Sequence, residues 1–225
     1  MTQTWNDLLF AHWPIAPEGL VRRIPPRFEL DSFDGRAWLG IVPFRMTNVA
    51  PRAVPVLPGL SEFPELNVRT YVRVGGRPGV YFFSLDAASA IAVRAARMVL
   101  NLPYHTAVMR VTADRDSVEY RSRRAGEPPV ASFEATYAPA APPFSPRPGS
   151  LEYFLTERYC LYATRRNGDP YRLEIHHPPW PLQLASAEIR TNTMADATGI
   201  DLPDTAPLLH FAKRQDMVAW MPEEI

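Results

Sequence analysis

The segment RMVLNLPYHTA (97–107) places a proline directly before two residues that can take part in proton transfer, Tyr104 and His105. A histidine can act as a general acid or base because its unperturbed pKa lies near neutrality. A tyrosine hydroxyl can donate a hydrogen bond to a carbonyl oxygen. We interpret both as candidate catalytic residues; the alternative is two ordinary residues at the start of a strand.

A second candidate group lies in FPELNVRTYV (63–72), where Glu65, Asn67, Arg69 and Tyr71 occupy alternate positions. Alternate residues of a strand share one face. A guanidinium binds a carboxylate through two parallel hydrogen bonds, so Arg69 is the candidate anchor of an anionic ligand, with Glu65 and Asn67 beside it. Alternatively, this face is exposed, or Glu65 and Arg69 form an ion pair that stabilises the sheet.

Further candidates lie between residues 158 and 181. Arg158 is a second candidate ligand for an anion, or else forms a surface ion pair with a nearby glutamate. In RLEIHHPPWP (172–181), neighbouring strand residues point to opposite faces, so the two histidines should not bind one metal ion. One of them, with His176 as the candidate, is expected at the site beside Trp180. We expect no metal site, because no histidine has a metal-binding spacing such as HExxH.

We expect no cofactor either. The glycines of VGGRPGVYFF (74–83) lack the strand–loop–helix context of a phosphate-binding loop and instead predict a hairpin turn at Gly75–Gly76. Cys160 lies among apolar and aromatic neighbours, which predicts a buried structural thiol. Lys213 is the only lysine, so a lysine-based mechanism has one candidate.

Composition excludes several classes of protein. The 225 residues include 24 basic and 24 acidic side chains, which gives a formal net charge of zero and no basic excess for binding nucleic acid. No apolar stretch approaches the roughly 18 residues of a membrane span. The N-terminus lacks the pattern of a signal peptide. We therefore expect a cytoplasmic protein without a membrane or nucleic-acid partner.

Many short strands and few helices predict a mostly β fold with attached helices, an antiparallel barrel or sandwich. Helices are expected at 18–24 and 87–101, with a third that begins near Ser150. The proline-rich segment 138–150 is interpreted as a crossover within one domain that spans residues 1–225. Strands are expected at 37–44, 66–74, 79–87, 106–114, 117–124, 130–137, 171–177 and 184–192.

Several segments together resemble the YqjF-like family of uncharacterised bacterial proteins, which is grouped with the acetoacetate decarboxylase-like superfamily. The resemblance implies a closed, mainly antiparallel barrel with a central cavity, and the superfamily's habit of assembling makes a homo-oligomer possible. The segments are LLFAHWP, DGRAWLGIVPFRM, FPELNVRTYV, GVYFFSLDA, LPYHTA, LEYFLTERYCLY, HHPPWPLQLA and PLLHFA.

The resemblance also implies roles for individual residues. In acetoacetate decarboxylase a lysine pair follows the proline, and one lysine forms a Schiff base with the substrate. The motif's arginine matches Arg97, and the lysine pair matches Tyr104 and His105, neither of which can form an imine. Glu65 resembles a glutamate of the decarboxylase pocket, whereas no carboxylate lies near Gly40, where that pocket has a second one.

Three hypotheses follow. In the first, the protein binds a small organic acid or similar polar metabolite through Arg69 and Glu65 without covalent chemistry. In the second, it is an acid–base enzyme, of isomerase or dehydratase type, that acts on a carbonyl compound with His105, Glu65 and Tyr104. In the third, the polar interior is purely structural. Fold alone does not separate these hypotheses.

Overall fold

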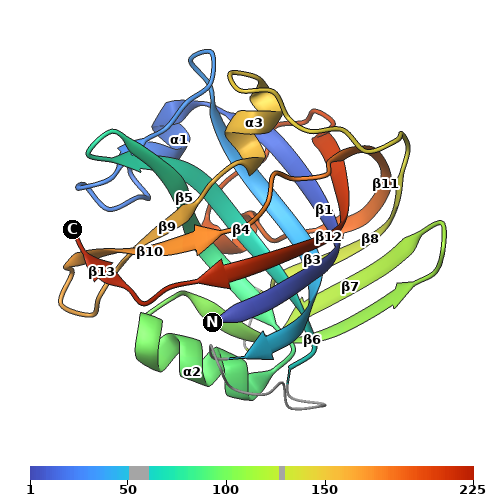
Figure 1. The fold of residues 1–225 in the computed structure, drawn as a ribbon, viewed down its shortest axis with the longest axis horizontal. Coiled ribbons are helices and arrows are strands. Elements are labelled where there is room, and N and C mark those ends of the chain that lie inside the picture. Colours follow the sequence, from blue (N-terminus) through green and yellow to red (C-terminus); the bar gives the residue numbers. More distant parts are fainter. Residues whose placement is uncertain (51–60, 127–129) are drawn as a thin grey trace.

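The computed structural model describes residues 1–50, 61–126 and 130–225 (Figure 1). Strands predominate, as expected from the sequence. The elements are β1 (Thr2–Ile15), α1 (Pro17–Val21), β2 (Glu29–Leu30), β3 (Ala37–Ala50), β4 (Phe63–Val74), β5 (Arg77–Ala87), α2 (Ala90–Leu100), β6 (Tyr104–Ala113), β7 (Val118–Arg124), β8 (Ser132–Pro139), α3 (Leu151–Thr156), β9 (Cys160–Thr164), β10 (Pro170–His176), β11 (Gln183–Asn192), the 3-10 helix η1 (Asp196–Thr198), β12 (Leu208–Ala219) and β13 (Glu223–Glu224).

The strands form one large, mostly antiparallel sheet that curls into a ring (Figure 1). The long strands β12, β1, β3, β4 and β5 lie side by side in that order. The ring is completed by short pairings, among them two residue pairs between β10 and β12 and the single pair Val80–Leu161 between β5 and β9. The mostly β fold is therefore confirmed, with one correction: across the described residues the sheet curls around but does not form a true closed barrel.

Local sequence signals explain the turns and helix ends. Gly75 and Gly76 have φ values of 57° and 78° and form the tight connection between β4 and β5, which confirms the predicted hairpin turn. The Ser89 side chain caps α2 by accepting a hydrogen bond from the Ala92 amide at 3.3 Å. Ser150 caps α3 in the same way, with the Tyr153 amide as donor at 3.2 Å.

The central strands, such as β4, are buried on both faces, so each face belongs to a different packed region of the protein. The outer face of β4, with Leu66 and Val68, packs against Tyr120 and Phe133 of the smaller sheet β6–β7–β8–β11. The opposite face surrounds what we call the central interior. Its side chains include Phe10 and His12 of β1, Val42 and Phe44 of β3, Glu65, Asn67, Arg69 and Tyr71 of β4, and Trp180 of the loop after β10.

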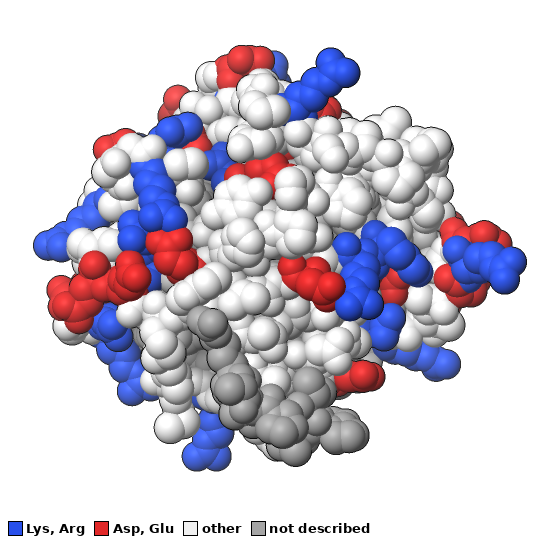
Figure 2. Space-filling model, in the orientation of Figure 1, with Lys and Arg blue, Asp and Glu red and all other residues white. Residues whose placement is uncertain are grey.

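The surface shows no extended region of one charge on the visible face of Figure 2, where basic and acidic side chains lie in mixed clusters with uncharged surface between them.

In the described ranges, no helix is both long and apolar enough to cross a membrane. Within the same ranges, no group of three or more His, Cys, Asp or Glu residues is placed to hold a metal ion.

Candidate functional site

Strand β4 carries the polar residues of the central interior. Glu65, Asn67, Arg69 and Tyr71 are all buried, with relative exposures of 2%, 5%, 7% and 0%. Their positions follow from the alternation of side chains along a strand, since the residues between them fill the outer core. Polar groups this deeply buried must be satisfied by one another or by a ligand.

Glu65 and Tyr104 form the first polar pair of this region. The Tyr104 hydroxyl donates a hydrogen bond to Glu65 Oε2 at 2.8 Å. Tyr104 reaches this position because β6 begins at Tyr104 and pairs in parallel with Leu85 of β5, directly beyond Pro103. Burial raises the pKa of Glu65 to about 8, with a further rise from the charge of Asp86 and an opposing effect of the Tyr104 hydrogen bond. The carboxyl group is therefore mostly protonated at neutral pH.

Arg69 is a buried guanidinium without a carboxylate partner. Its Nη2 donates to the Leu155 carbonyl at 3.2 Å, and its Cζ lies 5.4 Å from the centroid of the Phe10 ring. Its Nε is buried and makes no hydrogen bond. Among the described residues, the partly buried Arg124 and the buried Arg158 have ion pairs and Arg69 has none. An unpaired buried cation is expensive and unusual, so Arg69 is the strongest indication of a binding site.

His12 lies next to Arg69 in a defined protonation state. The Tyr71 hydroxyl donates its proton to the Leu155 carbonyl at 2.8 Å, so His12 Nε2, 2.6 Å from the same hydroxyl oxygen, is the donor of that second bond. Burial and the nearby Arg69 lower the pKa of His12 well below its usual value, which keeps the imidazole neutral. Its Nδ1 is then a buried acceptor, and no described residue is its hydrogen-bond partner.

Gly40 leaves the space that the side chains of His12 and Arg69 occupy. It lies opposite His12 in the β1–β3 pairing and opposite Arg69 in the β3–β4 pairing. A Cβ atom at this position would lie 2.9 Å from His12 Nε2 and 3.3 Å from Arg69 Cγ. A larger residue would therefore displace both side chains.

Other unpartnered polar atoms lie in the same part of the molecule. Trp180 packs edge-on against Phe10 with 5.0 Å between ring centroids, and His210 is the cross-strand neighbour of Phe10. Trp180 Nε1, both ring nitrogens of His210 and Asn67 Oδ1 are buried without a hydrogen bond among the described residues. Each such group destabilises the fold by about 1–3 kcal/mol unless something else satisfies it.

The structure separates His105 from Tyr104. The two are consecutive residues of β6, so their side chains point to opposite faces. His105 lies beside Asp86 and Arg124 and lines a groove outside the central interior. His105 and Glu65, the acid–base pair of the second hypothesis, are therefore not brought together.

The remaining predicted residues are distributed as follows. Arg158 is buried and its Nη1 forms an ion pair with Asp31 Oδ2 at 2.7 Å, so it already has a carboxylate partner. Arg97 is exposed on α2. His176 is exposed, and its ring packs against the ring of Trp220. Its neighbour His177 is the buried member of the pair, with 5.2 Å between its ring centroid and that of Trp180.

Sequence reasoning missed the contribution of β1 and β12 to the site. His12 and His210 are isolated histidines in the sequence, with no spacing that indicates a site. What indicates a role for these two histidines is that they lie opposite particular residues of neighbouring strands. That position can be recognised only when the strands that pair with β1 are known. The single lysine lies elsewhere: Lys213 is exposed, and its Nζ forms an ion pair with Asp7 at 2.6 Å.

The ring-shaped sheet and its buried polar face define a class of proteins with the acetoacetate decarboxylase-like fold. A structure of the enduracididine biosynthesis enzyme MppR with bound HEPES superposes with a TM-score of 0.69 at 12% identity, over 100% of this chain and 87% of the other. Acetoacetate decarboxylase from Legionella pneumophila gives a TM-score of 0.64 at 14% identity, over 100% and 86% of the two chains. These similarities establish the fold alone.

Within that class, the chain belongs to the DUF2071 family, described as an uncharacterized conserved protein, whose model matches residues 2–216. It is 50% identical over 220 residues to the uncharacterized protein YqjF of Bacillus subtilis (strain 168), which covers 98% of this chain and 90% of that protein. Both the family resemblance and the implied relation to acetoacetate decarboxylase-like folds are confirmed.

Proposed function

We propose that this protein binds a small organic carboxylate in the central interior, with Arg69 as its anchor. The observation that carries the proposal is the buried guanidinium of Arg69, which has no carboxylate partner among the described residues and an unpartnered Nε. A bound carboxylate would supply two acceptors to the guanidinium edge that includes Nε. It would also neutralise a charge that otherwise destabilises the fold.

The neighbouring groups suit the rest of such a ligand. Asn67 lies two residues from Arg69 on the same face of β4, so a keto or hydroxyl group next to the carboxylate lies toward its side chain. The Glu65–Tyr104 pair is roughly 14 Å from Arg69 along the strand, at about 3.4 Å per residue. A small carboxylate held by Arg69 therefore does not reach the Glu65–Tyr104 pair, and only a longer ligand contacts both. Phe10, Phe44 and Trp180 provide apolar walls.

The known ligands of fold neighbours are compatible with this proposal. MppR has been crystallised in complex with pyruvate, a small 2-keto carboxylate, and that structure superposes with a TM-score of 0.66. At 12% identity, the comparison supports only the chemical class of the ligand, a small carboxylate.

Covalent catalysis through a Schiff base is not part of the proposal. The residues that match the lysine pair of acetoacetate decarboxylase are Tyr104 and His105, and a phenol or imidazole does not form a stable imine. Lys213 is the only side-chain amine of the sequence. Its side chain is exposed and forms an ion pair with Asp7.

A second candidate function, acid–base catalysis on a carbonyl compound, is favoured by one specific observation. Glu65 has a pKa of about 8 and accepts a hydrogen bond from Tyr104, so a carboxyl group that can gain or lose a proton near neutral pH lies beside a hydrogen-bond donor. In this candidate, Glu65 transfers the proton and Tyr104 polarises the carbonyl. His105 takes no part because it lies on the other face of β6.

Native mass spectrometry of the freshly purified protein tests the proposed function. We expect a retained small acid in the wild type, released on denaturation and lost in Arg69→Met. Arg121→Met is the matched control, because Arg121 is an exposed arginine whose ion pair with Glu134 lies on β7 and β8, away from the central interior. A ligand retained equally by both variants would contradict the proposal, and turnover of that ligand lost in Glu65→Gln would favour the enzyme.

A further inference from the structure

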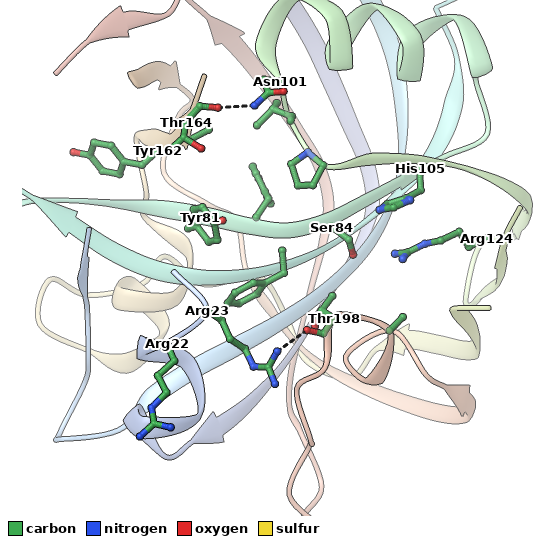
Figure 3. A pocket seen from close by; sticks show the side chains of 16 residues that line it. Arg22, Arg23, Tyr81, Ser84, Asn101, His105, Arg124, Tyr162, Thr164 and Thr198 are labelled. Carbon is green, nitrogen blue, oxygen red and sulfur yellow. Dashed lines mark hydrogen bonds between the residues drawn. The ribbon is translucent and has the colours of Figure 1, made fainter. Parts of the chain in front are cut away.

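A groove of about 560 Å³ lies on the side of β5 that faces away from Glu65 and Arg69. Its floor is formed by residues 81–84 of β5 (Figure 3). The volume falls within the range of sites for small-molecule ligands. The groove shares neither Glu65 nor Arg69 with the site proposed above, so the two are independent.

The groove occurs where the sheet is interrupted. Along one edge, β5 pairs with β9 through Val80 and Leu161, and it pairs with β6 only from Leu85 and Tyr104 onward. Between these points, residues 81–84 have no strand partner on that edge among the described residues. The interruption leaves β5 backbone groups at the groove floor, where they can bind a ligand.

The groove has a positive charge that its own lining does not neutralise. Arg22, Arg23 and Arg124 line it together with His105, and none of the described lining residues is an aspartate or glutamate. Arg124 is balanced by the fully buried Asp86, which it contacts through Nε and Nη2, so its Nη1 is uncommitted. Arg22 and Arg23 have no ion pair among the described residues.

Hydrogen-bond donors of the groove converge from several elements. The Ser84 hydroxyl is buried, with 1% exposure, and makes no hydrogen bond to the part of the chain that the structure describes. In Figure 3 it points into the space between His105, Arg124 and Thr198. Arg23 is held at the mouth by a 3.1 Å hydrogen bond from its Nη1 to the Thr198 carbonyl.

The groove lining also includes apolar residues, among them Phe83, Leu102 and Pro103. Tyr81 and Tyr162 are further lining residues. At its far end, Asn101 Nδ2 donates to the Thr164 carbonyl at 2.9 Å, which joins the loop after α2 to the end of β9 (Figure 3). A ligand that fits this groove therefore combines a flat apolar body with a group of negative charge.

We propose that the groove is a second ligand site that binds an aryl phosphate monoester, with the phosphate between Ser84, Arg124 and Arg23. A phosphate presents three terminal oxygens, which matches donors that approach from three elements better than the two oxygens of a carboxylate. The aromatic body lies against the tyrosine side of the groove. This site is separate from the carboxylate site of the central interior.

The test is titration calorimetry with phenyl phosphate, supported by amide chemical shifts from NMR. We expect binding that shifts the amides of residues 81–84, that is at least about tenfold weaker in Arg23→Gln, and that is also weaker in Ser84→Ala. Ser84→Ala should fold normally, since its hydroxyl has no partner to lose. Arg147→Gln, an exposed arginine that does not line the groove, should bind as the wild type does.

Comparison ligands and a second variant complete the test. Benzoate should bind more weakly than phenyl phosphate, and Arg69→Met should leave phenyl phosphate binding unchanged, even if the carboxylate proposal fails. Equal affinities for benzoate and phenyl phosphate would overturn the assignment of a phosphate site. Undiminished binding by Arg23→Gln, or loss of binding in Arg69→Met, would overturn the groove as the location.

Discussion

The Tyr104 hydroxyl lies 2.8 Å from Glu65 Oε2, although the two residues are 39 positions apart and belong to strands β6 and β4 that are separated by β5. The strand between them presents the small residue Ala87 opposite Glu65, which leaves room for the Tyr104 ring to reach across. The result is a buried carboxyl group with one hydrogen-bond donor and a pKa raised by burial to about 8.

This raised pKa predicts how stability depends on pH. In the unfolded chain Glu65 titrates near 4.5, and in the folded protein near 8, so between these values the native state binds more protons than the unfolded state. The stabilising contribution of Glu65 is fully present below pH 4.5 and decreases as the pH rises to about 8, by on the order of 5 kcal/mol in total.

We therefore expect the free energy of unfolding of the wild type to fall between pH 5 and 8 relative to that of Glu65→Gln, which has no titrating carboxyl group at this position. Urea unfolding at several pH values measures the difference. Glu119→Gln, on the exposed side of β7, is the control and should follow the wild type. Parallel pH profiles of the wild type and Glu65→Gln would show that Glu65 is not buried in its neutral form.

The two buried arginines should respond differently to substitution. Arg69→Met removes an unpaired charge and one hydrogen bond to the Leu155 carbonyl, which keeps its bond from Tyr71. Its free energy of unfolding should equal or exceed that of the wild type. Arg158→Met leaves Asp31 buried with only the more exposed Arg73 as partner, and should destabilise the protein by about 3 kcal/mol.

Chemical denaturation of both variants without added ligand measures these differences. A loss of several kcal/mol in Arg69→Met would show that Arg69 is a structural residue of the sheet. Such a result would favour the third hypothesis, in which the polar interior has no ligand.

Much of this arrangement could be predicted from the sequence, because it depends on local periodicity. Alternation along 63–72 correctly groups Glu65, Asn67 and Arg69 on one buried face. The hairpin at Gly75–Gly76 and the helix cap at Ser150 likewise depend only on nearby residues. All eight expected strands overlap observed ones.

Contacts between distant segments could not be predicted in this way. β1 was not expected as a strand, since its sequence TQTWNDLLFAHWPI alternates only irregularly, and its bulges shift the register against β3 between Asn6 and Ala11. Arg158 forms an ion pair with Asp31, a residue 127 positions away in the sequence. The sequence therefore did not indicate that Arg158 has a carboxylate partner. The extent of the domain, residues 1–225, stays a prediction.

Gly40 should be intolerant of a side chain. Gly40→Ala places a Cβ 2.9 Å from His12 Nε2, so the buried His12–Tyr71 hydrogen bond must shift, with an expected destabilisation of about 1–3 kcal/mol. Gly19→Ala is the matched control, because its Cβ would lie 3.4 Å from Ile15 Cγ2 in ordinary contact and alanine favours the helix α1. Thermal unfolding of the two variants compares them, and equal melting temperatures would argue against the tight approach at Gly40.

A trapping experiment tests the exclusion of Schiff-base chemistry. We expect no mass increase when the protein is incubated with acetoacetate and borohydride, because Lys213 is exposed and ion-paired with Asp7. Intact mass spectrometry detects any adduct, and Lys213→Arg is the control for non-specific reduction. An adduct on Lys213, with carbon dioxide release that is lost in Lys213→Arg, would contradict the expectation.

The affinity of pyruvate for the wild type, Arg69→Met and Arg121→Met, measured by titration calorimetry, tests the central claim most directly. Pyruvamide, which keeps the keto group and lacks the charge, is the matched ligand. We predict that the wild type and Arg121→Met bind pyruvate alike, that Arg69→Met loses at least about tenfold in affinity, and that pyruvamide binds weakly to all three. Equal pyruvate affinity in the wild type and Arg69→Met, or equal binding of pyruvate and pyruvamide by the wild type, would contradict a carboxylate site at Arg69.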